Sequence, residues 1–114
     1  MVAGPYRAAT AEERRARLAD LERAARGVWQ RGHVPLLALN LGLPMVADLE
    51  RPLGDQPLDD RQQTLVDELA LSLVDRCDAI LQIARSPGSD MEVERFRARG
   101  ARVYRSVEEV PGPE

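Results

Sequence analysis

The chain has 114 residues, which is the usual size of one domain, and 44% of them are hydrophobic, so we expect a single domain over 1–114 with its own core. A net charge of −3 and an aromatic content of 4% argue against nucleic-acid binding, which favours a positive field and exposed rings. The single cysteine excludes an intramolecular disulfide, and the absence of a hydrophobic leader or span predicts a cytoplasmic protein without a membrane partner.

The first third of the chain predicts a strand, a long helix and a second strand. Residues 1–3 are a short apolar segment that fits a first strand. Thr10 and Glu13 have the spacing of a capping box, and apolar residues then recur at helical spacing, which predicts an amphipathic helix from about 11 to 31. The apolar run at 34–39 predicts a buried strand.

The middle of the chain predicts a long connection followed by a helix and a strand. Residues 40–61 are rich in glycine, proline and acids, and we expect at most two helical turns there, around 43–49. A connection of this length is more typical of a lid or binding loop, although an idle linker is the alternative. Apolar spacing then predicts a helix that ends by about residue 76, and 78–84 reads as a buried strand.

The last part of the chain predicts one more helix and strand. Residues 86–90 form a small-residue loop, 91–99 a helix and 101–104 a strand, before a short turn capped by Ser106 and Glu109. Alternating strands and helices predict a three-layer α/β domain of the flavodoxin or Rossmann type. It would hold a parallel sheet of about four to five strands with helices on both faces.

A site in such a fold lies beyond the carboxyl ends of the strands. Three connections reach that edge, at 4–10, 40–61 and 85–91. The third offers hydroxyl and backbone donors to an anion, with Arg7 and Arg85 at the sides, and so predicts a phosphate site. Ordinary turn residues are the alternative interpretation. The candidate donors in this connection are Ser86, Gly88 and Ser89.

Glu92 is the main candidate for chemistry, because it follows this connection at the mouth of the predicted cleft. Its carboxylate could act as a nucleophile or proton acceptor on a bound sugar. Ser89 and Glu92 also have the spacing of a capping box, in which Glu92 would only bond the backbone of Ser89. Tyr6, after the first strand, is either an orienting phenol over the same space or a packing residue.

No metal or other cofactor is predicted. His33 has no partner at metal-ligand spacing, and Cys77 has no histidine nearby in sequence, so a structural ring and a buried thiol are expected.

Four segments, in this order, resemble the nucleoside 2-deoxyribosyltransferase-like superfamily, and within it a branch of small bacterial proteins of unknown function. They are Ala-Gly-Pro-Tyr-Arg at 3–7, Gly-His-Val-Pro at 32–35, Arg-Cys-Asp-Ala-Ile at 76–80 and Ser-Pro-Gly-Ser-Asp-Met-Glu-Val at 86–93. The resemblance covers nearly the whole chain.

The resemblance implies hydrolysis or exchange of the N-glycosidic bond of a nucleoside or nucleoside 5′-monophosphate. It makes Glu92 the nucleophile, and it places Ser86 and Gly88 on a phosphate. The connection after the first strand would orient the nucleophile or contact the sugar through Gly4, Tyr6 and Arg7. Asn40, Asp67, Arg85 and Asp90 are further possible site residues.

The chain departs from this family at two positions. Ala70 stands where active relatives carry an aspartate that contacts the sugar, and Asp67 lies nearly one helical turn before it. Asp90 replaces a glycine of the phosphate loop, where a carboxylate repels phosphate. A catalytically inactive module that binds a nucleotide or phosphometabolite, as a sensor or accessory protein, is therefore the alternative function.

A departing base needs a proton, and the acids of the long connection, Asp48, Asp55 and Asp59, are the candidates for supplying it. The partner is a small-molecule nucleoside or nucleotide. Apolar helix surface around 65–73, together with the dimers and larger oligomers of relatives, predicts a homodimer or larger homo-oligomer.

Overall fold

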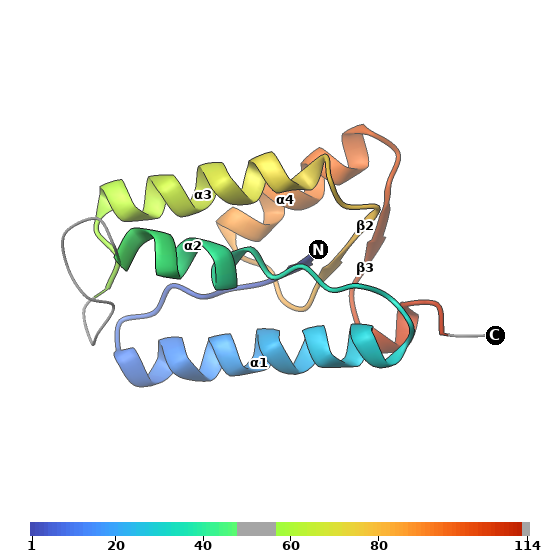
Figure 1. Ribbon diagram of the computed structural model, residues 1–114, viewed down its shortest axis with the longest axis horizontal. Helices are drawn as coiled ribbons and strands as arrows, with labels where there is room; N and C mark the ends of the chain where they lie inside the picture. Colours follow the sequence, from blue (N-terminus) through green and yellow to red (C-terminus); the bar gives the residue numbers. More distant parts are fainter. Residues whose placement is uncertain (48–56, 113–114) are drawn as a thin grey trace.

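The computed structural model describes residues 1–47 and 57–112, which form a small parallel sheet covered by helices (Figure 1). The elements in chain order are β1 (Val2–Ala3), α1 (Ala11–Gln30), α2 (Ala38–Ala47), α3 (Asp60–Val74), β2 (Ala79–Gln82), α4 (Pro87–Ala98), β3 (Arg102–Tyr104) and the 3-10 helix η1 (Val107–Glu109). No helix in the described ranges combines the length and hydrophobicity needed to cross a membrane.

The sheet is smaller than predicted. In 1–47 and 57–112 it has three parallel strands in the order β1-β2-β3, where four to five were expected. The predicted strand at 34–39 is wrong, because α2 already begins at Ala38 and the residues before it have no regular structure. The Val2 N–H donates to the Leu36 carbonyl at 2.8 Å, but Pro35 has no N–H and β1 has only two residues. A longer ladder therefore does not form.

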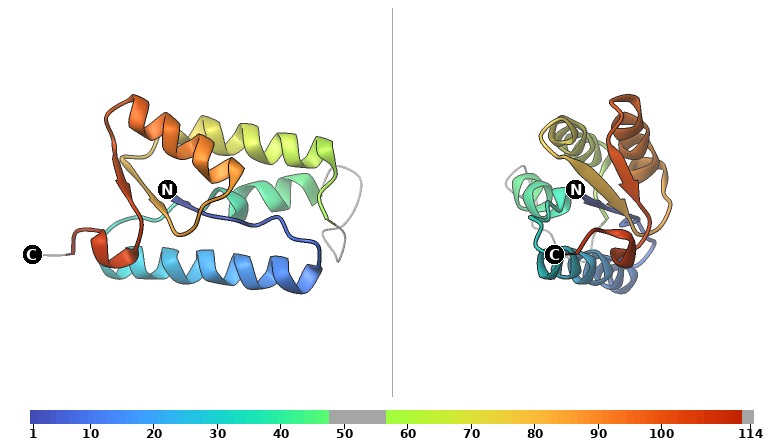
Figure 2. Two further views of the ribbon diagram at one scale, coloured as in Figure 1. Left: turned by 180° about the vertical axis from the view of Figure 1, so that it is seen from behind. Right: turned by 90° about the vertical axis from the view of Figure 1, so that its right-hand side faces the viewer.

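Helices cover both faces of the sheet, as predicted. Side chains alternate along β1 and β2, so that Val2 and Leu81 face α1, whereas Ala3 and Ile80 face α3 and α4. Figure 2 shows α1 and η1 on one side of the strands and α3 with α4 on the other. The first core cluster includes Leu21, Ala24 and Val28, and the second includes Val74, Val93 and Phe96.

The helix ends show which local signals were correctly interpreted. Thr10 Oγ1 accepts from the Glu13 N–H at 3.1 Å, and α1 ends one residue before the predicted position. α2 is longer than the two turns expected, and Pro44 lies within it. α3 begins at Asp60 because Asp59 and Gln62 form a capping box that the prediction missed.

α4 begins earlier than predicted, so the expected loop at 86–90 is wrong. Ser86 is the N-cap residue and forms a reciprocal capping box with Ser89, and Pro87 occupies the first helical position. Proline fits there because its fixed φ suits a helix and its missing N–H needs no partner. The alternative capping box between Ser89 and Glu92 is therefore not formed.

The chain closes with β3 and η1, close to the predicted positions. The cap of the final turn differs, however, because Ser106 makes no side-chain capping bond. Instead, the Arg105 N–H donates to Glu109 Oε2 at 3.0 Å.

Candidate functional site

A cavity of about 510 Å³ lies at the carboxyl edge of β1 and β2, where the connections leave the sheet in opposite directions. α1 follows β1 on one face, and α4 follows β2 on the other (Figure 2). Such a divergence opens a crevice at the strand ends, which is where open α/β sheets bind ligands.

The cavity brings together most of the candidate residues from the sequence. Among the residues that line it are Gly4, Tyr6, Arg7, Asp67, Arg85, Ser86, Gly88, Ser89 and Glu92. Two candidates are not among its lining residues. Asn40 is exposed on α2, and Asp90 points into a polar cluster at the start of α4.

Glu92 is half-buried on α4. Within 1–47 and 57–112 its carboxylate has no hydrogen-bond or ion-pair partner. Burial raises the pKa of Glu92 to about 7, the Asp67 carboxylate adds to this rise, and the chain's terminal ammonium opposes it. Glu92 therefore exchanges a proton near neutral pH and is a stronger base than an ordinary carboxylate.

The α3 wall of the cavity supplies a second carboxylate. Gln63, Val66, Asp67 and Ala70 line the cavity, and Gln63 Nε2 donates to Asp67 Oδ1 at 2.8 Å. The structure thus places Asp67 on the same wall as Ala70, where the expected aspartate is missing. Gln63 was not predicted from the sequence, although its spacing to Asp67 and Ala70 puts all three on one helix face.

The α1 wall carries a cation, Arg17. Arg17 and Leu21, four residues apart, both line the cavity. The Arg17 guanidinium donates to the carbonyl of Arg7, and Arg14 Nη1 donates to the carbonyl of Ala8 at 2.9 Å. These two bonds tie the connection that contains Tyr6 and Arg7 to the helix. Neither Arg14 nor Arg17 was predicted from the sequence.

The hydroxyl groups at the start of α4 are used within the protein. Ser86 Oγ accepts from the Ser89 N–H at 3.2 Å, and Ser89 Oγ accepts from the Ser86 N–H at 3.1 Å. The Ser86 hydroxyl also donates to Ser89 Oγ at 2.8 Å. Ser89 is buried, at 3% exposure. Both serines therefore have a capping role.

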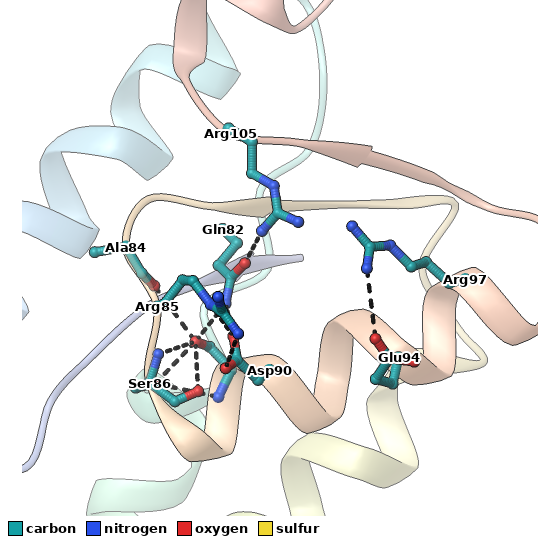
Figure 3. Close-up of polar contacts among 9 residues, drawn as sticks. Gln82, Ala84, Arg85, Ser86, Asp90, Glu94, Arg97 and Arg105 are labelled. Carbon is teal, nitrogen blue, oxygen red and sulfur yellow. Dashed lines mark hydrogen bonds and ion pairs between the residues drawn. The ribbon is translucent and has the colours of Figure 1, made fainter.

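A buried amide connects this helix start to the sheet (Figure 3). Gln82 is 2% exposed, and its Nε2 donates to Ser89 Oγ at 2.8 Å and to Asp90 Oδ1 at 2.7 Å. Its Oε1 accepts from Arg105. Arg85 Nη2 also donates to Asp90 Oδ2 at 3.1 Å. This hydrogen bond is the main reason why the pKa of Asp90 is lowered, and the hydrogen bond from Gln82 lowers it further. Asp90 is thus already paired.

The remaining candidates have other roles. His33 Nε2 lies 2.6 Å from the Pro111 carbonyl, and Cys77 is a half-buried free thiol. Asp59 caps α3, whereas Asp48 and Asp55 fall outside the described residues. In the part of the chain that the structure describes, no cluster of three or more His, Cys, Asp or Glu side chains is arranged to hold a metal ion.

The apolar surface expected to mediate self-association is partly covered within one chain. Leu65, Leu69 and Leu73 on α3 are all half-buried. Among the described residues, the large apolar side chains that are exposed are Trp29, Val34, Leu41, Met45 and Met91. Oligomerisation stays a prediction.

Comparison with models of known families, with curated proteins and with solved structures finds no significant match, so the resemblance given above stays a prediction from the sequence.

Proposed function

We propose that the protein cleaves the N-glycosidic bond of a nucleoside or nucleoside 5′-monophosphate, or transfers its sugar to another base, with Glu92 as the nucleophile. The observation that carries the proposal is the half-buried Glu92 carboxylate, which lines the cavity at the strand ends and has no partner among the described residues. The cavity volume of about 510 Å³ lies within the usual range for small-molecule sites.

The reaction is a retaining displacement. A Glu92 oxygen forms a bond to the anomeric carbon C1′ while the C1′–N bond breaks, and its electron pair leaves on the base, which takes a proton from solvent. Water then forms a bond to C1′ as the ester bond to Glu92 breaks, which restores the carboxylate and releases a proton. A second base in place of water gives transfer.

Neighbouring groups support this chemistry. The Asp67 carboxylate, held by Gln63, is an acceptor for sugar hydroxyls in place of the aspartate missing at Ala70. Asp67 and Glu92 together stabilise the positive charge that develops on the sugar. The Tyr6 phenol lines the same space and is available to orient Glu92.

Base release tests the proposal. Wild type and Glu92→Gln are incubated with deoxyribonucleosides, ribonucleosides and their 5′-monophosphates, and free base is followed by chromatography. We expect release by wild type and a loss of at least a hundredfold in Glu92→Gln. Glu94→Gln is the matched control, because Glu94 is exposed on α4 and pairs with Arg97. Equal rates in Glu92→Gln and wild type would exclude Glu92 as the nucleophile.

The alternative function is a nucleotide-binding module without catalysis. Ala70 favours it, because this side chain is 5% exposed in the cavity wall and offers no polar group to a sugar. The same panel distinguishes the two functions. A module would be stabilised against heat by some of these compounds, in wild type and Glu92→Gln alike, without any release of base.

A further inference from the structure

We propose that Arg17 holds an anionic group of the ligand against α1, so that the site prefers a nucleoside 5′-monophosphate to the matching nucleoside. This inference rests on the function proposed above and names its substrate class. It differs from the family resemblance, which assigns the phosphate to Ser86 and Gly88 at the start of α4.

Arg17 is a half-buried cation in the cavity wall. It donates to the carbonyl of Arg7, which is a neutral acceptor. Asp20, three residues on, bonds Arg23 instead, at 2.8 Å. No carboxylate among the described residues pairs with Arg17. A guanidinium in this setting gains both charge compensation and forked hydrogen bonds when an anion binds.

The surrounding connection holds this cation in place. Arg14, one turn before Arg17, is 5% exposed and donates to the carbonyl of Ala8. The bonds from Arg14 and Arg17 fix consecutive carbonyls of the β1–α1 connection. Arg17 is therefore positioned before a ligand arrives, and Arg7 adds a second, exposed cation beside it.

The start of α4 is a poorer anion site. Pro87 has no N–H, and the Ser89 N–H and both serine hydroxyls serve the capping box. Within the described part of the chain, this leaves the Gly88 N–H as the donor of the first turn without a partner. The Asp90 carboxylate adds negative charge to the same turn.

Charges in the cavity are arranged as a nucleotide requires. α1, which carries Arg17, lies on one side of the sheet, whereas α4 with Glu92 and α3 with Asp67 lie on the other (Figure 2). Arg85, the lining cation beside α4, is already paired with Asp90. A nucleoside 5′-monophosphate becomes positive at C1′ in the transition state and carries its negative phosphate on C5′, across the sugar ring. The cation on α1 therefore suits the phosphate, and the carboxylates on α3 and α4 suit the positive C1′.

Calorimetric titration tests the inference separately from catalysis. The full chain with Glu92→Gln, which prevents turnover, is titrated with the four 2′-deoxynucleoside 5′-monophosphates and with the matching nucleosides. Arg17→Gln, Arg17→Lys and Ser86→Ala are added one at a time. Arg26→Gln is the matched control, because Arg26 is exposed on the same helix.

We expect Arg17→Gln to raise the Kd of the monophosphate at least tenfold and to change the Kd of the nucleoside less than twofold. Arg17→Lys gives an intermediate value, and Arg26→Gln and Ser86→Ala leave the ratio of the two Kd values unchanged. The inference would be overturned if Arg17→Gln left the ratio of the two Kd values unchanged, or if Ser86→Ala abolished the preference for the monophosphate. It would also be overturned if no monophosphate bound more tightly than its nucleoside.

The inference and the proposed function fail in different ways. Base release by wild type, without Arg17-dependent preference for the monophosphate, retains the function and overturns the inference. Arg17-dependent monophosphate binding without base release supports the inference and rejects the catalytic role of Glu92.

Discussion

Glu92 combines burial with a neighbouring carboxylate, and this has a cost for the folded protein. A carboxyl whose pKa is raised from 4.5 to about 7 by burial and by Asp67 keeps its proton in the folded state at pH values where the unfolded chain has lost it. The contribution of Glu92 to stability therefore falls as pH rises from about 4.5 to 7. It stays at its lowest value above that range.

Glu92→Gln removes this ionisation and should become more stable than wild type as pH rises. Since one pKa unit corresponds to about 1.4 kcal/mol, we expect the difference in unfolding free energy to grow by roughly 2 to 3 kcal/mol between pH 4.5 and pH 8. Urea unfolding at both pH values measures it. Glu94→Gln, the exposed control, should follow wild type throughout, and a difference for Glu92→Gln that is the same at both pH values would contradict the prediction.

At the scale of elements, the start of α4 depends on a contact between distant parts of the chain. Gln82 ends β2, and its buried amide reaches Ser89 and Asp90 on α4 and Arg105 after β3. The capping serines, the cation beyond β3 and the carboxylate of Asp90 are therefore held in one network. This network sets where α4 begins and so where Glu92, in the second turn of the helix, lies.

Gln82→Leu should destabilise the protein by about 1 to 3 kcal/mol, because it removes the hydrogen bonds of a buried amide to Ser89, Asp90 and Arg105. Arg85→Ala removes the other partner of Asp90. It should cost much less stability than Gln82→Leu, since the Arg85 side chain is 82% exposed and solvent screens its ion pair. Thermal and urea unfolding of both variants test this contrast. Equal losses would show that the buried amide has no special role.

Local signals predicted some elements and not others, for physical reasons. α1 and β3 were predicted to within about one residue, because the Thr10 N-cap, helical spacing and a short apolar run specify them. The segment at 34–39 is as apolar as a buried strand. It forms no strand, because its neighbour β1 has only two residues with which it could pair. The start of α4 was missed because Ser89 serves in the capping box where glutamate or glutamine is usual.

The residues of the candidate site could likewise be predicted only in part from local signals. Glu92, Tyr6 and the residues around Gly88 follow predicted strands, so their meeting at the strand ends could be anticipated. The partners that determine their chemistry come from elsewhere in the chain. Asp67 reaches the cavity because α3 packs beside α4, and Arg17 because α1 lies under β1 (Figure 1). Such contacts depend on tertiary packing, which periodicity does not report.

At the scale of the whole molecule, α1 and the sheet approach each other closely beside the cavity. Gly4 follows β1 and lines the cavity between Leu21 of α1 and Ile83 after β2. A Cβ atom at this position would lie 2.8 Å from Ile83 Cγ1 and 3.2 Å from Leu21 Cδ2. A side chain there would displace Ile83 and push α1 away from the sheet.

Gly4→Ala should therefore lower the unfolding free energy by about 1 to 3 kcal/mol, the usual cost of overpacking. Gly88→Ala is the matched control, because Gly88 lines the same cavity and a Cβ atom there meets nothing within 4 Å. Its stability should stay equal to wild type or rise slightly, since alanine favours helix. Urea unfolding compares the two. If Gly4→Ala is as stable as Gly88→Ala, the sheet and α1 tolerate separation, and their close contact at Gly4 is not needed for stability.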